Sequence, residues 1–113
     1  MAVAMCRALK VLCVATDPEA LAALKRASVS ADWELAPGAT TATEALAQLN
    51  EERPHIVVAF GDFERFVAEA RRAYPVLRIV VDRDLPGATA VATSLEDIRD
   101  VLKGLPRPGG PVR

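Results

Sequence analysis

Short apolar runs alternate with segments of helical periodicity along almost the whole chain, and this alternation most constrains the fold. The apolar runs occupy residues 9–15, 33–36, 55–60, 76–82 and 88–92. Between them, apolar residues recur every three or four positions, as on the buried face of a helix. Strands that alternate with helices in this way specify an α/β fold around a mainly parallel sheet. The run at 55–60 is apolar nearly throughout, which is typical of a central strand covered on both faces.

Capping residues mark where the helices begin. Asp17 followed by Pro18 is suited to a helix N-cap and first helical position, and Thr41 with Glu44 forms a capping-box pattern. Asp62 is expected to cap the next helix, and Ser94 the last. The positions expected to face the core or to share an apolar helix face are Leu21, Leu24, Ala27, Ala45, Leu46, Leu49, Phe63, Phe66, Val67 and Ala70. The apolar positions of the last helix are Leu95, Ile98, Val101, Leu102 and Leu105.

The length suits one domain, expected over residues 1–105, followed by a tail or linker rich in Pro and Gly over 106–113. No apolar run approaches the ~18 residues that a membrane span requires, and no secretory signal pattern opens the chain. We therefore expect a cytoplasmic protein that does not enter a membrane. The formal net charge of −1 gives no general attraction to nucleic acid, so direct nucleic-acid binding is not expected.

Few residues could support catalysis or metal binding. Cys6 and Cys13 are the only cysteines and His55 is the only histidine, so we expect ordinary thiols, no metal site and no cofactor. The expected topology assembles no nucleophile, base and orienting group, and a non-enzymatic protein is therefore favoured.

Three stretches resemble the receiver domains of bacterial response regulators, the CheY-like superfamily. Residues 11–21 (VLCVATDPEAL) resemble its first strand and acidic turn, and residues 43–60 (TEALAQLNEERPHIVVAF) its second helix and phosphorylation strand. Residues 86–102 (PGATAVATSLEDIRDVL) resemble its fifth strand and last helix. The resemblance extends over residues 8–104. It implies a flavodoxin-like, three-layer sandwich with a five-stranded, mainly parallel sheet in the order 2-1-3-4-5.

The residues that carry receiver chemistry are replaced in this sequence. In the family, carboxylates hold Mg²⁺ beside a nucleophilic aspartate, because a hard cation must neutralise the incoming phosphoryl oxygens. By the resemblance, the acidic pair falls on Ala15 and Thr16, and the phosphoacceptor on Phe60. The switch hydroxyl falls on Asp82 and the phosphate-binding lysine on Ser94. The resemblance therefore implies a degenerate pseudo-receiver that lacks the phosphorylation site.

Two nearby carboxylates, Asp17 and Asp62, are better explained as helix caps than as a metal ligand and a displaced phosphoacceptor. Asp82, Arg83 and Asp84 are interpreted first as a solvated charge cluster. Phe60 is expected to fill the former phosphoryl cavity, stabilising the fold by about 1.5–3 kcal/mol if it is fully buried.

The fourth helix of the family is missing, because only residues 83–87 separate the fourth and fifth strand patterns. Parallel strands usually need a longer crossover that contains a helix. Either an extended loop replaces the helix and the fifth strand stays parallel, or the strand turns back as an antiparallel edge. The first alternative is favoured, since right-handed parallel crossovers predominate in such sheets.

These features predict a phosphorylation-independent module for protein–protein interaction in bacterial signal transduction or transcription regulation. Its expected partner is a kinase, a transcription regulator or a fused output domain, and a homodimer is compatible with this role. Candidate contact residues are Trp33 and the loop of Asp82, Arg83, Asp84 and Leu85. The alternative hypothesis is a small-molecule sensor with its ligand at the carboxyl ends of the strands, near Phe60.

Overall fold

The computed structural model describes residues 9–30 and 33–104. Its strands are β1 (Leu9–Val14), β2 (Trp33–Leu35), β3 (Ile56–Ala59), β4 (Arg78–Val81) and β5 (Ala90–Val91). Its helices are α1 (Pro18–Ser28), α2 (Ala42–Glu52), α3 (Glu64–Ala73) and α4 (Leu95–Gly104). Cys6, Leu105 and the tail expected over 106–113 lie outside the described residues, so the predicted domain boundary stays a prediction.

The five strands form one sheet in the order β2-β1-β3-β4-β5, and every neighbouring pair is parallel. The register places Val14 beside Ala59, Ala59 beside Val81, and Val81 beside Val91. The strand order and the parallel fifth strand were both predicted, and both are confirmed. Because all strands run the same way, the residues that follow Val14, Ala59 and Val81 meet at one edge of the sheet.

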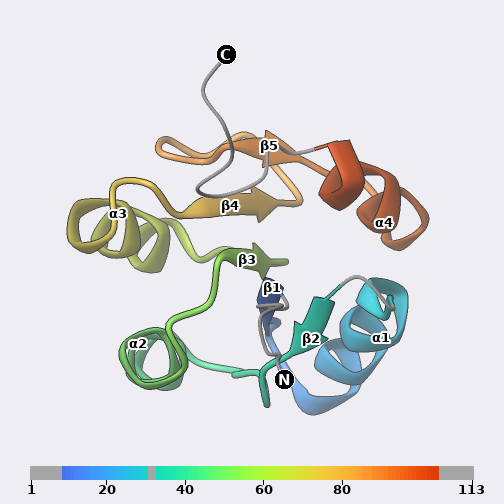
Figure 1. The fold of residues 1–113 in the computed structure, drawn as a ribbon, viewed down its shortest axis with the longest axis horizontal. Coiled ribbons are helices and arrows are strands. Elements are labelled where there is room, and N and C mark those ends of the chain that lie inside the picture. The colour runs from blue at the N-terminus through green and yellow to red at the C-terminus, as the bar shows by residue number, and fades with distance from the viewer. Residues whose placement is uncertain (1–8, 31–32, 105–113) are drawn as a thin grey trace, which may run out of the picture.

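Helices cover both faces of the sheet, which gives three layers (Figure 1). On one face α1 and α4 pack over β-strand residues such as Val11, Cys13 and Val58, and on the other α2 and α3 pack over Leu12 and Val57. All four residues of β3 are buried. The apolar run at 55–60 is therefore the central strand that its composition predicts. Among the described residues, no helix combines the length and the hydropathy needed to cross a bilayer.

Two helices begin where the sequence predicts. The Asp17 carboxylate accepts a hydrogen bond from the Ala20 amide at 2.8 Å and caps α1. The Thr41 hydroxyl accepts from the Glu44 amide at 3.1 Å and caps α2. The return bond of the capping box is shifted by one residue, because the Glu44 carboxylate accepts from the Thr40 amide at 3.1 Å.

The start of α3 corrects the sequence prediction. Its N-cap residue is Phe63, with no side-chain hydrogen bond at the cap, and Asp62 is exposed in the turn before it. The turn passes through Gly61 at φ +126°, so the chain enters the helix one residue later than the Asp62 pattern implies. The buried face of α3 is nevertheless the predicted one, since Phe66, Val67 and Ala70 are buried.

A loop over residues 82–89 replaces the helix expected between β4 and β5 in a receiver. It turns through Gly87 at φ +91°, a conformation that glycine adopts without steric cost. Leu85 and Ala88 pack against the apolar cluster beneath α3. The loop therefore covers the sheet face in place of the missing helix, while β5 stays parallel.

Candidate functional site at the carboxyl ends of the strands

The turns that follow β1 and β3 touch one another at this edge of the sheet. A Cβ atom on Gly61 would lie 2.6 Å from the Thr16 Cγ2 methyl and 3.1 Å from the Phe63 ring. Only glycine fits there, since L side chains also rarely adopt its φ of +126°. The Thr16 methyl thus lies against the backbone of the turn that follows β3.

A carboxylate closes the same edge from the third strand. Asp82, the first residue after β4, accepts a hydrogen bond at Oδ1 from the Gly61 amide at 3.3 Å. The same oxygen accepts from Arg83 Nε at 3.1 Å, and Oδ2 accepts from Arg83 Nη2 at 3.4 Å. Hydrogen bonding to Asp82 and the negative charge of its carboxylate raise the pKa of the Arg83 guanidinium.

The Asp82 side chain is partly buried, since only 21% of it is exposed, whereas 51% of the Arg83 side chain is exposed. Asp82 is therefore not a freely solvated charge. Asp84 is exposed and Leu85 half-buried in the following loop. The charge cluster predicted from the sequence therefore divides into an anchored Asp82–Arg83 pair and an exposed Asp84.

Phe60 directly follows β3 and is half-buried. Its amide donates to the Val14 carbonyl at 2.9 Å, and its side chain packs on the cluster beneath α1 and α4, which includes Ala15 and Val58. Burial of the ring is incomplete, so its contribution to stability falls below the roughly 1.5–3 kcal/mol expected for a fully buried phenylalanine.

The remaining residues of the predicted pocket follow strands or precede a helix at this edge and differ in exposure. Ala15 is buried after β1, Thr16 is exposed, and Ser94 is half-buried just before α4. Asp17 Oδ1 is engaged in capping α1. No group of three or more His, Cys, Asp or Glu side chains able to hold a metal ion occurs among residues 9–30 and 33–104.

The donors at this edge do not fit the Mg²⁺ that the receiver fold implies. A hard cation of this kind prefers several oxygen ligands, with carboxylates to offset its charge. The side chains of Ala15 and Phe60 offer no such oxygen. The Asp82 carboxylate accepts three hydrogen bonds within the protein. At this edge Asp82 is thus already engaged by the protein itself and Asp17 Oδ1 caps α1, which leaves Asp62 as the exposed carboxylate, where a receiver needs several that are free to bind a cation.

Trp33, a candidate contact residue, lies at the start of β2 and is 7% exposed. Its indole Nε1 donates to the Ser28 carbonyl at 2.6 Å, and its ring packs on the cluster beneath α1 and α4. Most of this ring is therefore committed to the core, which leaves residues 82–85 as the accessible part of the predicted contact set.

Arg71 of α3 holds the β4–β5 loop in place, a role that no sequence pattern indicates. Its guanidinium donates to the carbonyls of Gly87 (3.0 Å), Pro75 (2.6 Å) and Leu77 (2.8 Å), and to the Thr89 hydroxyl (3.2 Å). An arginine in the last turn of a helix, on its polar face, usually points into solvent, so the sequence offers no reason to expect these bonds. The contacts depend on the path of the loop, which no local pattern specifies.

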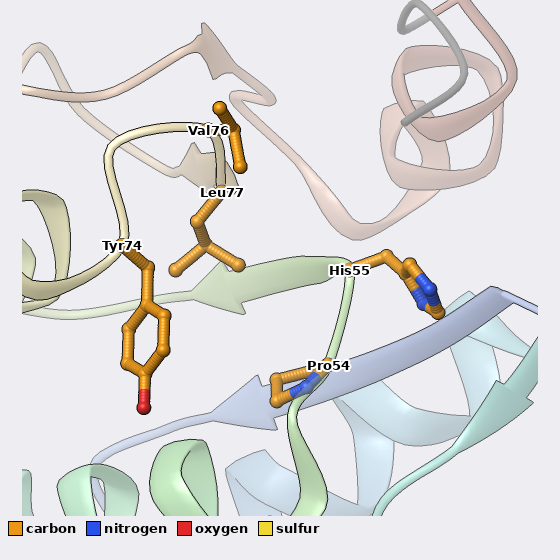
Figure 2. Close-up of a pocket in the computed structure, with 5 residues that line it drawn as sticks. All are labelled: Pro54, His55, Tyr74, Val76 and Leu77. Atoms are coloured by element: carbon orange, nitrogen blue, oxygen red, sulfur yellow. The ribbon is translucent and has the colours of Figure 1, made fainter. Parts of the chain in front are cut away.

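A hollow of about 130 Å³ lies at the opposite edge of the sheet (Figure 2). Its lining residues are Pro54, His55, Tyr74, Val76 and Leu77. The His55 imidazole turns away from the Tyr74 ring in Figure 2, and its Nδ1 accepts from the Lys10 amide at 3.0 Å. His55 thus ties the start of β3 to β1, far from the strand ends. The hollow is smaller than the roughly 300–1,000 Å³ typical of small-molecule sites.

Comparison with known proteins finds the same architecture. No protein-family model and no curated protein matches the sequence. Similar solved structures include the receiver domain of an HD domain-containing protein from Pseudomonas fluorescens Pf-5 (TM-score 0.73, 19% identity, covering 86% of this chain and 93% of that one). The chemotaxis protein CheY4 of Vibrio cholerae gives a TM-score of 0.71 at 19% identity, covering 86% of this chain and 98% of CheY4.

An orphan response regulator of H. pylori is also similar, with a TM-score of 0.68 at 9% identity, covering 84% of this chain and 93% of that one. At such low identity the likeness concerns the arrangement of strands and helices. The parallel sheet in the order 2-1-3-4-5, with helices on both faces, agrees with it. The chain therefore has the fold of the CheY-like receiver domains of response regulators.

Proposed function

We propose that this chain is a pseudo-receiver, a non-catalytic and phosphorylation-independent module that acts in bacterial signal transduction by binding another protein. The observation that carries the proposal is the hydrogen bond between the Gly61 amide and the Asp82 carboxylate, at 3.3 Å. This internal bond brings a fixed negative charge to the strand ends, where an incoming phosphoryl group would be repelled. Phe60, which directly follows β3, offers no nucleophilic atom.

The loop between β4 and β5 supports the same proposal. A phosphorylation switch requires an element with two arrangements of similar free energy. Here residues 82–89 are fixed at one end by Asp82 and at the other by Arg71, through its bonds to Gly87 and Thr89. We infer that this region stays in a single arrangement and presents a constant surface.

The surface we assign to a protein partner is the loop of Asp82, Arg83, Asp84 and Leu85. Asp84 is exposed and Leu85 is half-buried, so the loop combines charge with accessible apolar area. Its partner would be a kinase, a transcription regulator or an output domain fused to the same chain. A small ligand near Phe60 is less favoured, because the Thr16 methyl and the Asp82 carboxylate close around Gly61.

Incubation with acetyl phosphate and Mg²⁺, followed by intact-mass measurement, tests phosphorylation independence. We expect no added phosphoryl group, whereas a phosphorylatable receiver domain treated in parallel gains one. A phosphoryl adduct that is absent from an Asp62→Asn variant would overturn the proposal by identifying Asp62 as the acceptor.

Affinity capture from host lysate tests the binding role, with an Asp82→Ala/Leu85→Ala double variant for comparison. We expect a signalling protein to be retained by the unmodified chain and lost with the variant. A Glu64→Ala variant, altered at an exposed residue of α3, is the matched control. Retention of the same protein by the double variant would exclude this loop as the docking surface.

A further inference from the structure

A second surface lies at the amino ends of β3 and β4, the edge of the sheet opposite the candidate site. Here the hollow of about 130 Å³ is lined on one side by Val76. Val76 is 80% exposed, more than any other large apolar side chain among the residues that the structure describes. An apolar side chain so exposed beside a hollow suits a packing contact with another molecule.

The walls of this hollow are apolar and held in place. Pro54 and Leu77 are buried, and in Figure 2 they lie around the same space as the Tyr74 ring. The Tyr74 hydroxyl donates a hydrogen bond to Asn50 Oδ1 at 2.7 Å, which fixes the ring. Since a cavity of about 150 Å³ can hold benzene, the hollow suits one apolar side chain of the size of leucine or phenylalanine.

Arg53 places a positive charge beside the hollow. Its guanidinium carbon lies 5.9 Å from the centre of the Tyr74 ring, and its Nε donates to the Asn50 carbonyl at 3.1 Å. Arg53 ends α2 at φ +50° and is the one described residue other than glycine with a positive φ. Glycine is the usual residue at such a cap. The helix end would therefore favour glycine, and the arginine suits a role beyond the cap.

A second cation lies behind the same turn. The Arg71 guanidinium donates to the carbonyls of Pro75 and Leu77, in the turn that carries Val76. In the described part of the chain neither Arg53 nor Arg71 forms an ion pair, because the ion pairs there join other residues. The hollow therefore combines apolar walls with two positive charges that have no carboxylate partner among the described residues.

We propose that an acidic segment of another protein docks on the surface formed by Arg53, Pro54, Tyr74, Val76 and Leu77. One apolar side chain of that segment enters the hollow, and a neighbouring carboxylate pairs with Arg53. An acidic occupant is attracted by the two arginines, whereas a basic one is repelled by them. The surface and the loop of residues 82–85 lie at opposite edges of the sheet. The inference therefore goes beyond the proposed function and does not depend on it.

Selection of random heptapeptides displayed on phage, with the full chain as the immobilised target, tests this surface without assuming a sequence. We expect the retained peptides to be rich in Asp and Glu and to share one large apolar residue. The most enriched peptide is then titrated into the ¹⁵N-labelled chain, and the amide signals of Tyr74, Val76 and Leu77 should shift in a saturable way. The Kd should rise with added salt, because screening weakens the attraction to the arginines.

Two substitutions separate the apolar contact from the charge. Val76→Asp places a carboxylate beside the hollow and should raise the peptide Kd about tenfold or more. Arg53→Gly removes the positive charge and should raise the Kd about two- to fivefold. Glycine suits the left-handed cap, so this variant keeps the helix end intact. Arg53→Lys keeps the charge and should recover most of the affinity.

Arg26→Ala, at an exposed arginine of α1, is the matched control and should leave the peptide Kd unchanged. Circular dichroism of each variant confirms that it is folded. Failure to enrich any peptide, or enrichment of apolar peptides without acidic residues, would overturn the proposal. Peptide binding that is unchanged in Val76→Asp would overturn the assignment to this surface. The acetyl phosphate experiment is independent of either result.

Discussion

The Gly61 amide donates a hydrogen bond to the Asp82 carboxylate at 3.3 Å, which joins the turn after β3 to the end of β4. The bond is backed by Arg83, whose guanidinium lies 3.1 Å from the same carboxylate oxygen. The bond therefore holds the end of β3 against the end of β4. In receiver domains the phosphorylation chemistry takes place at this edge of the sheet.

Asp82→Ala should lower the free energy of unfolding by about 1 kcal/mol, because the Gly61 amide loses its acceptor at a partly buried site. Hydrogen exchange at Gly61 should speed up in the same variant. Denaturant unfolding and amide exchange measure the two effects. Asp84→Ala, at an exposed neighbouring aspartate, is the control, and equal effects of both substitutions would show that the Gly61–Asp82 bond contributes nothing specific.

Gly61→Ala should destabilise the fold by about 1–3 kcal/mol, since it combines a strained positive φ with a steric clash. The clash is with the Thr16 Cγ2 methyl, which would lie 2.6 Å from the new alanine Cβ. Adding Thr16→Ser removes that methyl and should recover part of the loss. A double variant no more stable than Gly61→Ala alone would mean that backbone strain accounts for the whole effect.

Arg71→Ala should loosen the β4–β5 loop, because four acceptors lose their shared donor. We expect the free energy of unfolding to fall by about 1–2 kcal/mol. This is less than four fully buried hydrogen bonds would contribute, because the guanidinium is partly exposed to solvent. Faster hydrogen exchange should be concentrated in residues 85–91. Arg72→Ala, at the exposed next residue of α3, is the control, and an equal exchange pattern in both variants would contradict the role given to Arg71.

Burial raises the pKa of the Cys13 thiol from its ordinary 9.0 to about 11. The unfolded thiol therefore ionises near pH 9 while the folded one stays protonated, so stability falls as the pH rises from about 9 through about 11. The full effect is about 2–3 kcal/mol. Urea unfolding at several alkaline pH values measures this effect. The free energy of unfolding should fall less steeply with pH in Cys13→Ala than in the chain that keeps Cys13, when both carry Cys6→Ser. Parallel curves would show that Cys13 does not titrate in this way.

The strands and helices could be predicted because they depend on local patterns, whereas the strand order 2-1-3-4-5 was implied by the resemblance to receiver domains. The apolar run at 55–60 and the caps at Asp17 and Thr41 each act within a few residues. The prediction of an Asp62 cap was wrong, because the N-cap residue of α3 is Phe63. Gly61 takes its positive φ in the turn before α3, where it lies against Thr16, and the helix begins only after this turn.

The bonds that shape the candidate site could not be predicted, since each joins residues far apart in the chain. Asp82 and Gly61 are separated by 21 positions, and Arg71 and Thr89 by 18. Their partners are determined by sheet register and by the path of residues 82–89. The sequence could place Phe60 and Asp82 at the strand ends, but only the structure shows which polar atoms they meet.

The most direct test of phosphorylation independence is an amide ¹H–¹⁵N spectrum recorded with Mg²⁺ and beryllofluoride, which mimics a bound phosphoryl group. If the Gly61–Asp82 bond and Phe60 exclude that group, the amide signals of Thr16, Gly61 and Asp82 stay unchanged up to saturating beryllofluoride. Saturable shifts of these three signals, absent with Mg²⁺ or fluoride alone, would show that the strand ends bind a phosphoryl mimic and would contradict the pseudo-receiver proposal.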